Sequence, residues 1–110
     1  MEPNETHPSW KAQLRYGKIQ TPFHHFTLLA EGIVGQLADG FVCPSGSAFM
    51  GMKTWASSED EAFDMVRVIG QHIGFTVTGK IYIYATEPSE PPKVKPHGYD
   101  INFTPFNPAA

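Results

Sequence analysis

The 110-residue chain has a single cysteine, Cys43, and few charged residues. One cysteine excludes an internal disulfide framework and is compatible with a reducing compartment. Charged residues make up 17% of the chain and sum to a net charge of -3, so the basic excess of an electrostatic nucleic-acid binder is lacking. We therefore expect no nucleic-acid partner.

Long apolar runs and a basic start are also lacking. No stretch approaches the roughly 18 apolar residues of a membrane span, and the first eight residues carry acids and prolines in place of a secretory signal. We expect a cytoplasmic protein with no membrane partner. Pro3 and Pro8 disfavour regular structure, so residues 1–10 are predicted to be a flexible N-terminal arm.

The remaining composition is that of a folded domain rich in turns. Hydrophobic residues make up 41% of the chain and aromatic residues 13%, with 10 glycines and 10 prolines. This content excludes a disordered chain and favours sheet over a helical bundle. We expect residues 11–110 to form a single α+β domain.

The clearest helix signal starts at Ser58. Ser58 and Glu61 have the spacing of a capping box, in which the hydroxyl accepts a backbone N–H and the acid reaches back. Four acids occupy the first turns, where the helix dipole stabilises negative charge: Glu59, Asp60, Glu61 and Asp64. An apolar stripe at helical spacing follows: Ala62, Met65, Val66, Ile69 and Ile73. Gly74 predicts a left-handed cap, and Gly70 a close approach to the sheet.

After Gly74 the apolar period changes to two, which predicts a strand through residue 86 with a bend at Gly79. A proline-stiffened loop follows at 87–96, and a last strand at 99–104 in which Tyr99, Ile101 and Phe103 share one face.

Earlier in the chain a strand is favoured over 11–20 and another over 48–55. Residues 23–35 fit either a helix or a glycine-bulged strand, and the strand is favoured.

Together these elements predict an antiparallel sheet with one main amphipathic helix packed on one face. The opposite sheet face would then carry Tyr82, Tyr84, Asn102 and Phe106. Aromatic residues on an uncovered face are either cross-strand packing or a partner surface.

The sequence offers only weak candidates for a catalytic, phosphate-binding or metal-binding site. Residues 46–54 nearly spell a phosphate-binding loop, but Met52 separates the second glycine from Lys53. His24 and His25 would point to opposite faces of a strand and so would not share a metal. Cys43 fits packing. We therefore predict no catalytic residue, no metal and no cofactor, and hence no enzyme.

The second half contains short motifs built on glycine, proline and tryptophan. They are GMKTWA at 51–56, IGF at 73–75, VTGKI at 77–81, TEP at 86–88, PP at 91–92 and GYDINFTP at 98–105. About half of the chain thereby resembles small immunity proteins made beside polymorphic, contact-dependent or type VI secreted bacterial toxins. The resemblance implies a compact α+β protein that binds a cognate toxin stoichiometrically and occludes it, without chemistry of its own.

The predicted partner-binding residues follow from charge and aromatic content. Large buried aromatics supply affinity, and complementary charge supplies on-rate and selectivity. The predicted set is Glu59, Asp60, Glu61, Asp64, Tyr82 and Tyr84. The alternative is a small-ligand-binding or regulatory domain, with a pocket between helix and sheet lined by Trp55, Tyr99 and Phe103.

Overall fold

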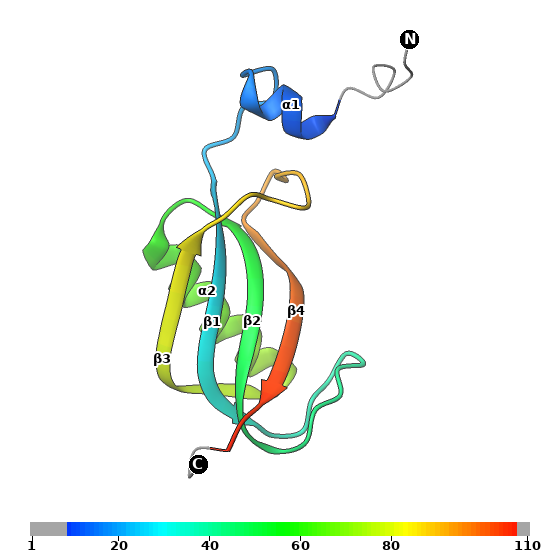
Figure 1. Ribbon diagram of the computed structural model, residues 1–110, viewed down its shortest axis with the longest axis vertical. Coiled ribbons are helices and arrows are strands. Elements are labelled where there is room, and N and C mark those ends of the chain that lie inside the picture. Colours follow the sequence, from blue (N-terminus) through cyan, green and yellow to red (C-terminus); the bar gives the residue numbers. More distant parts are fainter. Residues whose placement is uncertain (1–8, 108–110) are drawn as a thin grey trace.

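The computed structural model describes residues 9–107 of the chain. In chain order the elements are α1 (Trp10–Arg15), β1 (His24–Val34), β2 (Gly46–Ala56), α2 (Glu59–Ile73), β3 (Phe75–Ala85) and β4 (His97–Pro105). The strands form one antiparallel sheet in the order β3-β1-β2-β4, and α2 runs diagonally across one face (Figure 1). The predicted α+β class, with an antiparallel sheet under one main helix, is confirmed.

Helix α2 begins and ends where its capping residues predict. Ser58 Oγ accepts the backbone N–H of Glu61 at 3.1 Å. The Glu61 carboxylate reaches back to Ser57, whose N–H and hydroxyl donate at 2.7 and 2.9 Å. At the other end Gly74 has φ 119° and donates its N–H to Gly70 O at 2.9 Å. Both ends of the helix are therefore satisfied by local hydrogen bonds.

The core lies between α2 and the sheet face that it covers. Each strand supplies alternate side chains to this face. The buried cluster consists of Phe26, Leu28, Ala30, Val34, Ala48, Met50, Met52, Ala56, Ala62, Val66 and Phe75. Gly70 is the point of close approach, as predicted, because a Cβ there would lie 3.1 Å from Met50 Sδ and 3.2 Å from the Phe75 ring.

A bulge bends the β1–β3 pair at the glycines. Ala30 pairs with Ile81 and Gly32 with Val77, so β3 carries extra residues around Gly79. Glu31 fills this irregularity, because its Oε1 accepts the backbone N–H of Lys80 at 3.2 Å. The predicted bent, glycine-containing strands are confirmed for both β1 and β3.

Two predictions in the N-terminal and C-terminal parts were wrong. The segment 11–20 holds helix α1, whose N-cap Ser9 accepts the N–H of Lys11 at 3.2 Å, where a strand was predicted. The regular alternation of the last strand breaks at Asp100, which has φ 55°. Tyr99 pairs with Lys53, and Phe103 with Met50, so these two aromatics lie on opposite faces of the sheet.

Helix α1 stands beyond one end of the sheet and has no buried residue (Figure 1). Trp10, at the end of the predicted arm, opens this helix, whereas residues 1–8 lie outside the described residues. Within residues 9–107, no helix has the length and apolar character needed to cross a membrane.

Replacing Gly74 with alanine is expected to lower the free energy of unfolding by about 3 kcal/mol. The backbone is left-handed there, and the new Cβ would collide with Gln36 O, because residues 35–38 fold back onto the end of α2. Gly40→Ala is the control: its φ is also positive, at 81°, but no atom crowds it. That variant should lose only about 1 kcal/mol. Urea denaturation measures both, and equal losses would contradict the steric contribution.

Candidate functional site

The sheet face turned away from α2, called the outer face below, has no helix on it. Strand alternation places Tyr82 and Tyr84 there, because Ile81 and Ile83 pack toward the core. In the register of the sheet Tyr82 lies beside Leu29, and Tyr84 beside Thr27. The tyrosines are 38% and 54% exposed. The structure therefore confirms that both tyrosines lie on an open face of the sheet.

Further apolar side chains continue this surface. Ile33 is exposed, Leu29 and Phe49 are partly exposed, and the rings of Phe49 and Phe106 pack at 4.6 Å between centroids. With Tyr82 and Tyr84 these residues form what we call the outer apolar patch: Leu29, Ile33, Phe49, Tyr82, Tyr84 and Phe106. Glu31 lies among them, because it stands between Leu29 and Ile33 on β1 and pairs with Phe49. Exposed apolar side chains grouped on one face are characteristic of interaction sites.

The four predicted acids lie on α2, on the other side of the sheet from the tyrosines. Glu61 is held by the helix cap, whereas Glu59, Asp60 and Asp64 are exposed. The predicted acids and tyrosines therefore do not form one continuous face. Two of the acids, Asp60 and Asp64, do lie beside the edge strand β3, which carries the tyrosines on its other side. Glu61 instead lies on the side of α2 that faces His97 of β4.

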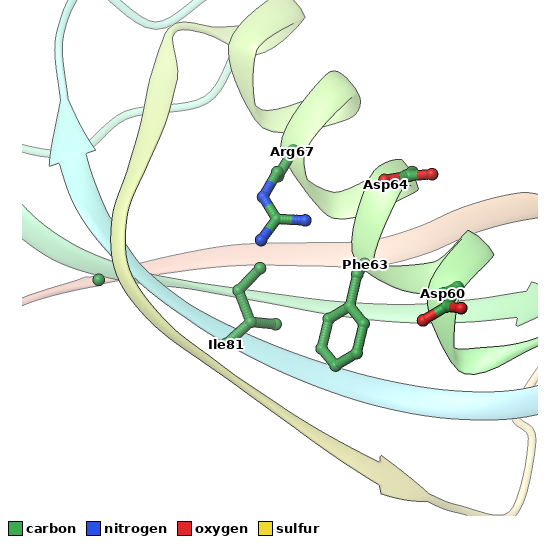
Figure 2. A pocket seen from close by; sticks show the side chains of 6 residues that line it. Asp60, Phe63, Asp64, Arg67 and Ile81 are labelled. Atoms are coloured by element: carbon green, nitrogen blue, oxygen red, sulfur yellow. The ribbon is translucent and has the colours of Figure 1, made fainter.

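A groove separates α2 from β3 (Figure 2). Its volume is about 490 Å³, and it is lined by Asp60, Phe63, Asp64 and Arg67 from α2 and by Gly79 and Ile81 from β3. Figure 2 shows the side chains of Phe63, from α2, and Ile81, from β3, both extending into the space between these elements, and they supply the apolar floor of the groove. Among the described residues, none of the three charged side chains is engaged in an ion pair. The groove thus combines an apolar floor with unpaired charge.

A buried polar cluster, which the sequence did not predict, lies at one end of the outer face. Residues 86–96, called the strap below, connect β3 to β4 and cover this polar cluster. The Tyr99 hydroxyl accepts the backbone N–H groups of Ser89 and Glu90 at 3.0 and 3.2 Å. Trp55 Nε1 donates to Glu90 O at 2.8 Å. The aromatic residues of the sheet therefore hold the strap through its backbone.

His25 completes this cluster. Its Nε2 lies 2.7 Å from the Tyr99 hydroxyl, and its Nδ1 lies 3.0 Å from Thr86 O. Because the hydroxyl already accepts two N–H groups, its own proton goes to Nε2, and Nδ1–H donates to the carbonyl. Burial lowers the pKa of His25, although the bond to Thr86 O acts in the opposite direction. The geometry and the pKa both favour a neutral imidazole.

His97 lies at the rim of the cluster, with its ring 5.6 Å from that of Tyr99. Burial lowers its pKa, as does the charge of Lys93, while Glu90 raises it. Both ring nitrogens are buried without a hydrogen-bond partner among the described residues, and Nε2 lies 3.8 Å from a Glu90 carboxylate oxygen.

The predicted ligand pocket of Trp55, Tyr99 and Phe103 is not formed. Trp55 and Tyr99 lie on the outer face beneath the strap, with exposures of only 3% and 9%. Phe103 lies on the helix side, where it packs on Phe41 and Phe75. The Asp100 bulge separates Tyr99 from Phe103, and a strict period of two does not anticipate it.

The other chemical candidates have structural roles. Residues 46–54 lie within β2, which is paired on both sides, so they make no phosphate-binding loop. Cys43 packs against the core. His24 is exposed while His25 is buried, and residues 9–107 contain no group of three side chains able to hold a metal. No family model, curated protein or solved structure matches this chain.

Acidification is expected to destabilise the fold through His25. Its folded-state pKa lies below the ordinary 6.5, so the unfolded chain binds more protons as the pH falls. The free energy of unfolding should therefore be highest above about pH 6.5 and decrease below it. Urea denaturation between pH 8 and 5 measures this slope, which should be smaller in His25→Asn and unchanged in His24→Asn. Equal slopes in all three proteins would contradict a buried neutral His25.

Tyr99→Phe is expected to release the strap. The change leaves the N–H groups of Ser89 and Glu90 without their acceptor, at a cost of about 1–3 kcal/mol. Amide hydrogen exchange at these two residues should become faster, and urea denaturation gives the loss in stability. Tyr84→Phe, on the exposed part of the same face, should stay within about 0.5 kcal/mol of the parent. Unchanged exchange at Ser89 and Glu90 would contradict this role of the hydroxyl.

Proposed function

We propose that this chain is an immunity protein that acts in the cytoplasm, binding a cognate bacterial toxin and neutralising it by stoichiometric occlusion. The observation that carries the proposal is the outer apolar patch, in which Tyr82 and Tyr84 stand exposed on a rigid sheet. Occlusion needs a shaped surface and no reactive group.

The outer apolar patch has the features of an interface core. Tyrosine brings a large apolar ring with a polar end, and it loses little conformational entropy when it is immobilised. Tyr82 has Leu29 beside it, and Phe49 packs on Phe106, so the exposed rings rest on ordered neighbours. Rigid aromatic anchors of this kind dominate binding energy in protein interfaces.

Charge supplies the second argument. The chain carries a net charge of -3, and Glu59, Asp60 and Asp64 are exposed on α2. Such a field speeds encounter with a basic partner and disfavours acidic ones. The resemblance of residues 51–105 to small immunity proteins agrees with a toxin domain as that partner.

The experiment combines this chain with the toxin domain encoded beside it. Co-expression should protect the host cell, and the purified proteins should form a one-to-one complex by isothermal titration calorimetry. The double variant Tyr82→Ala/Tyr84→Ala is expected to weaken binding by at least about thirtyfold, because truncating two anchors removes the centre of the interface. Tyr16→Ala is the matched control, because Tyr16 is a 75% exposed tyrosine that lies at the C-terminal end of α1 and is not part of the outer apolar patch.

Two outcomes would contradict the proposal. If the neighbouring toxin is neither bound nor neutralised, the function is wrong. If the double variant binds as tightly as the parent chain, the outer apolar patch is not the interface.

A further inference from the structure

The two edges of the sheet differ in how they are protected. β4 forms one edge and ends at Pro105. It is bulged at Asp100, whose carboxylate forms an ion pair with the Lys53 ammonium at 2.9 Å. Bulges, charges and prolines are the usual devices that prevent an edge strand from pairing with another chain. β3 forms the other edge, and after its irregularity near Gly79 it continues through Ile81–Ala85 without charge or proline.

The outward backbone groups of this half of β3 have no strand beside them among the described residues. β3 pairs with β1 only, and α2 lies against the sheet face. The side chains of Ile81–Ala85 are isoleucine, tyrosine and alanine, a composition that favours strand pairing. An edge of this kind is a template for the addition of one more strand.

The groove of Figure 2 lies on the helix side of β3 beside Gly79 and Ile81, so it meets the run Ile81–Ala85 at its first residue. Its floor is formed by Phe63 and Ile81, and its charged lining has two carboxylates, Asp60 and Asp64, against one guanidinium, Arg67. The excess charge is negative. A lysine or arginine fits this chemistry, because its aliphatic stem packs on the apolar floor while its cationic end meets the carboxylates.

Tyr82 and Tyr84 border the same edge on the outer face. Side chains of an added strand would point alternately to the two faces of the sheet. One set would enter the groove, and the other would lie beside the tyrosines. The β3 edge is thus a place from which one partner segment can contact both the acids and the tyrosines.

We propose that the partner docks by adding an extended segment to the edge of β3 at Ile81–Ala85, with basic side chains seated in the groove and apolar ones beside Tyr82 and Tyr84. This inference rests on the proposed function and specifies how the toxin domain binds. The partner segment is a strand that alternates basic and apolar residues.

Charge favours such a partner over a second copy of this chain. A second β3 paired through Ile81–Ala85 offers no lysine or arginine from that run. The second copy would also bring its own Asp60, Asp64 and Arg67, which together add further net negative charge to the seam.

The first test uses synthetic peptides and the full chain labelled with ¹⁵N. A capped heptapeptide of alternating lysine and valine should shift the amide signals of Ile81–Ala85, and the same peptide with glutamate for lysine should not. Two further peptides carry N-methyl groups on one or the other alternate set of residues. Methylation of one set removes the N–H groups that face β3 and should weaken binding at least tenfold, whereas the other set should be tolerated.

Variants of the groove give the second test. Asp60→Asn/Asp64→Asn is expected to weaken binding of the lysine-valine peptide about tenfold, since two exposed charge contacts are lost. Glu59→Gln is the matched control, because Glu59 is an exposed acid of the same helix that does not line the groove. Its affinity should be that of the parent chain.

Several results would overturn the inference. One is that the peptide shifts no amide signals, or shifts only signals outside β3. Another is that both methylated peptides bind equally well, or that Glu59→Gln loses as much peptide affinity as Asp60→Asn/Asp64→Asn. A last one is that the chain alone sediments as a dimer that the peptide dissociates.

The toxin domain distinguishes this inference from the proposed function. If it binds but leaves amide exchange in Ile81–Ala85 unchanged, strand addition fails and the proposed function stands. If the peptide binds β3 while no toxin binds, the proposed function fails and the edge site stands.

Discussion

Burial of one sheet face under α2 is the constraint on which the rest of the structure depends. Every strand contributes side chains to this single core, and Gly70 lets the helix approach Met50 and Phe75 closely. Because α2 is the only long helix among the described residues, it covers one face and leaves the other without a helix. The outer face must therefore be stabilised by its own cross-strand pairs and by the strap.

The outer face divides into a closed end and an open part. At the closed end His25, Trp55 and Tyr99 bind the strap through partly buried hydrogen bonds, which satisfy polar groups that burial would otherwise penalise. In the open part Tyr82 and Tyr84 remain accessible. Buried aromatics thus hold the loop between β3 and β4, while exposed ones leave a surface for a partner beside the β3 edge.

Sequence patterns predicted the elements whose signals are local. The cap at Ser58, the glycine at position 74 and the change of period at Phe75 set α2 and β3 correctly. Helix α1 was missed because it is short and has no buried residue to generate an apolar stripe. The register beyond Asp100 was missed because a positive φ at a residue other than glycine leaves no periodic signal.

The sequence by itself determined the fold class, the capped helix, and the identity of the acids and tyrosines, since each depends on residues close together in the chain. Tertiary structure alone decided that Asp60 and Asp64 lie beside one face of the edge strand β3 and the tyrosines lie on its other face. It alone also brought His25 within hydrogen-bond distance of Tyr99, 74 positions along the chain. Strand order and register set such distances, and they arise from the packing of the whole sheet on α2.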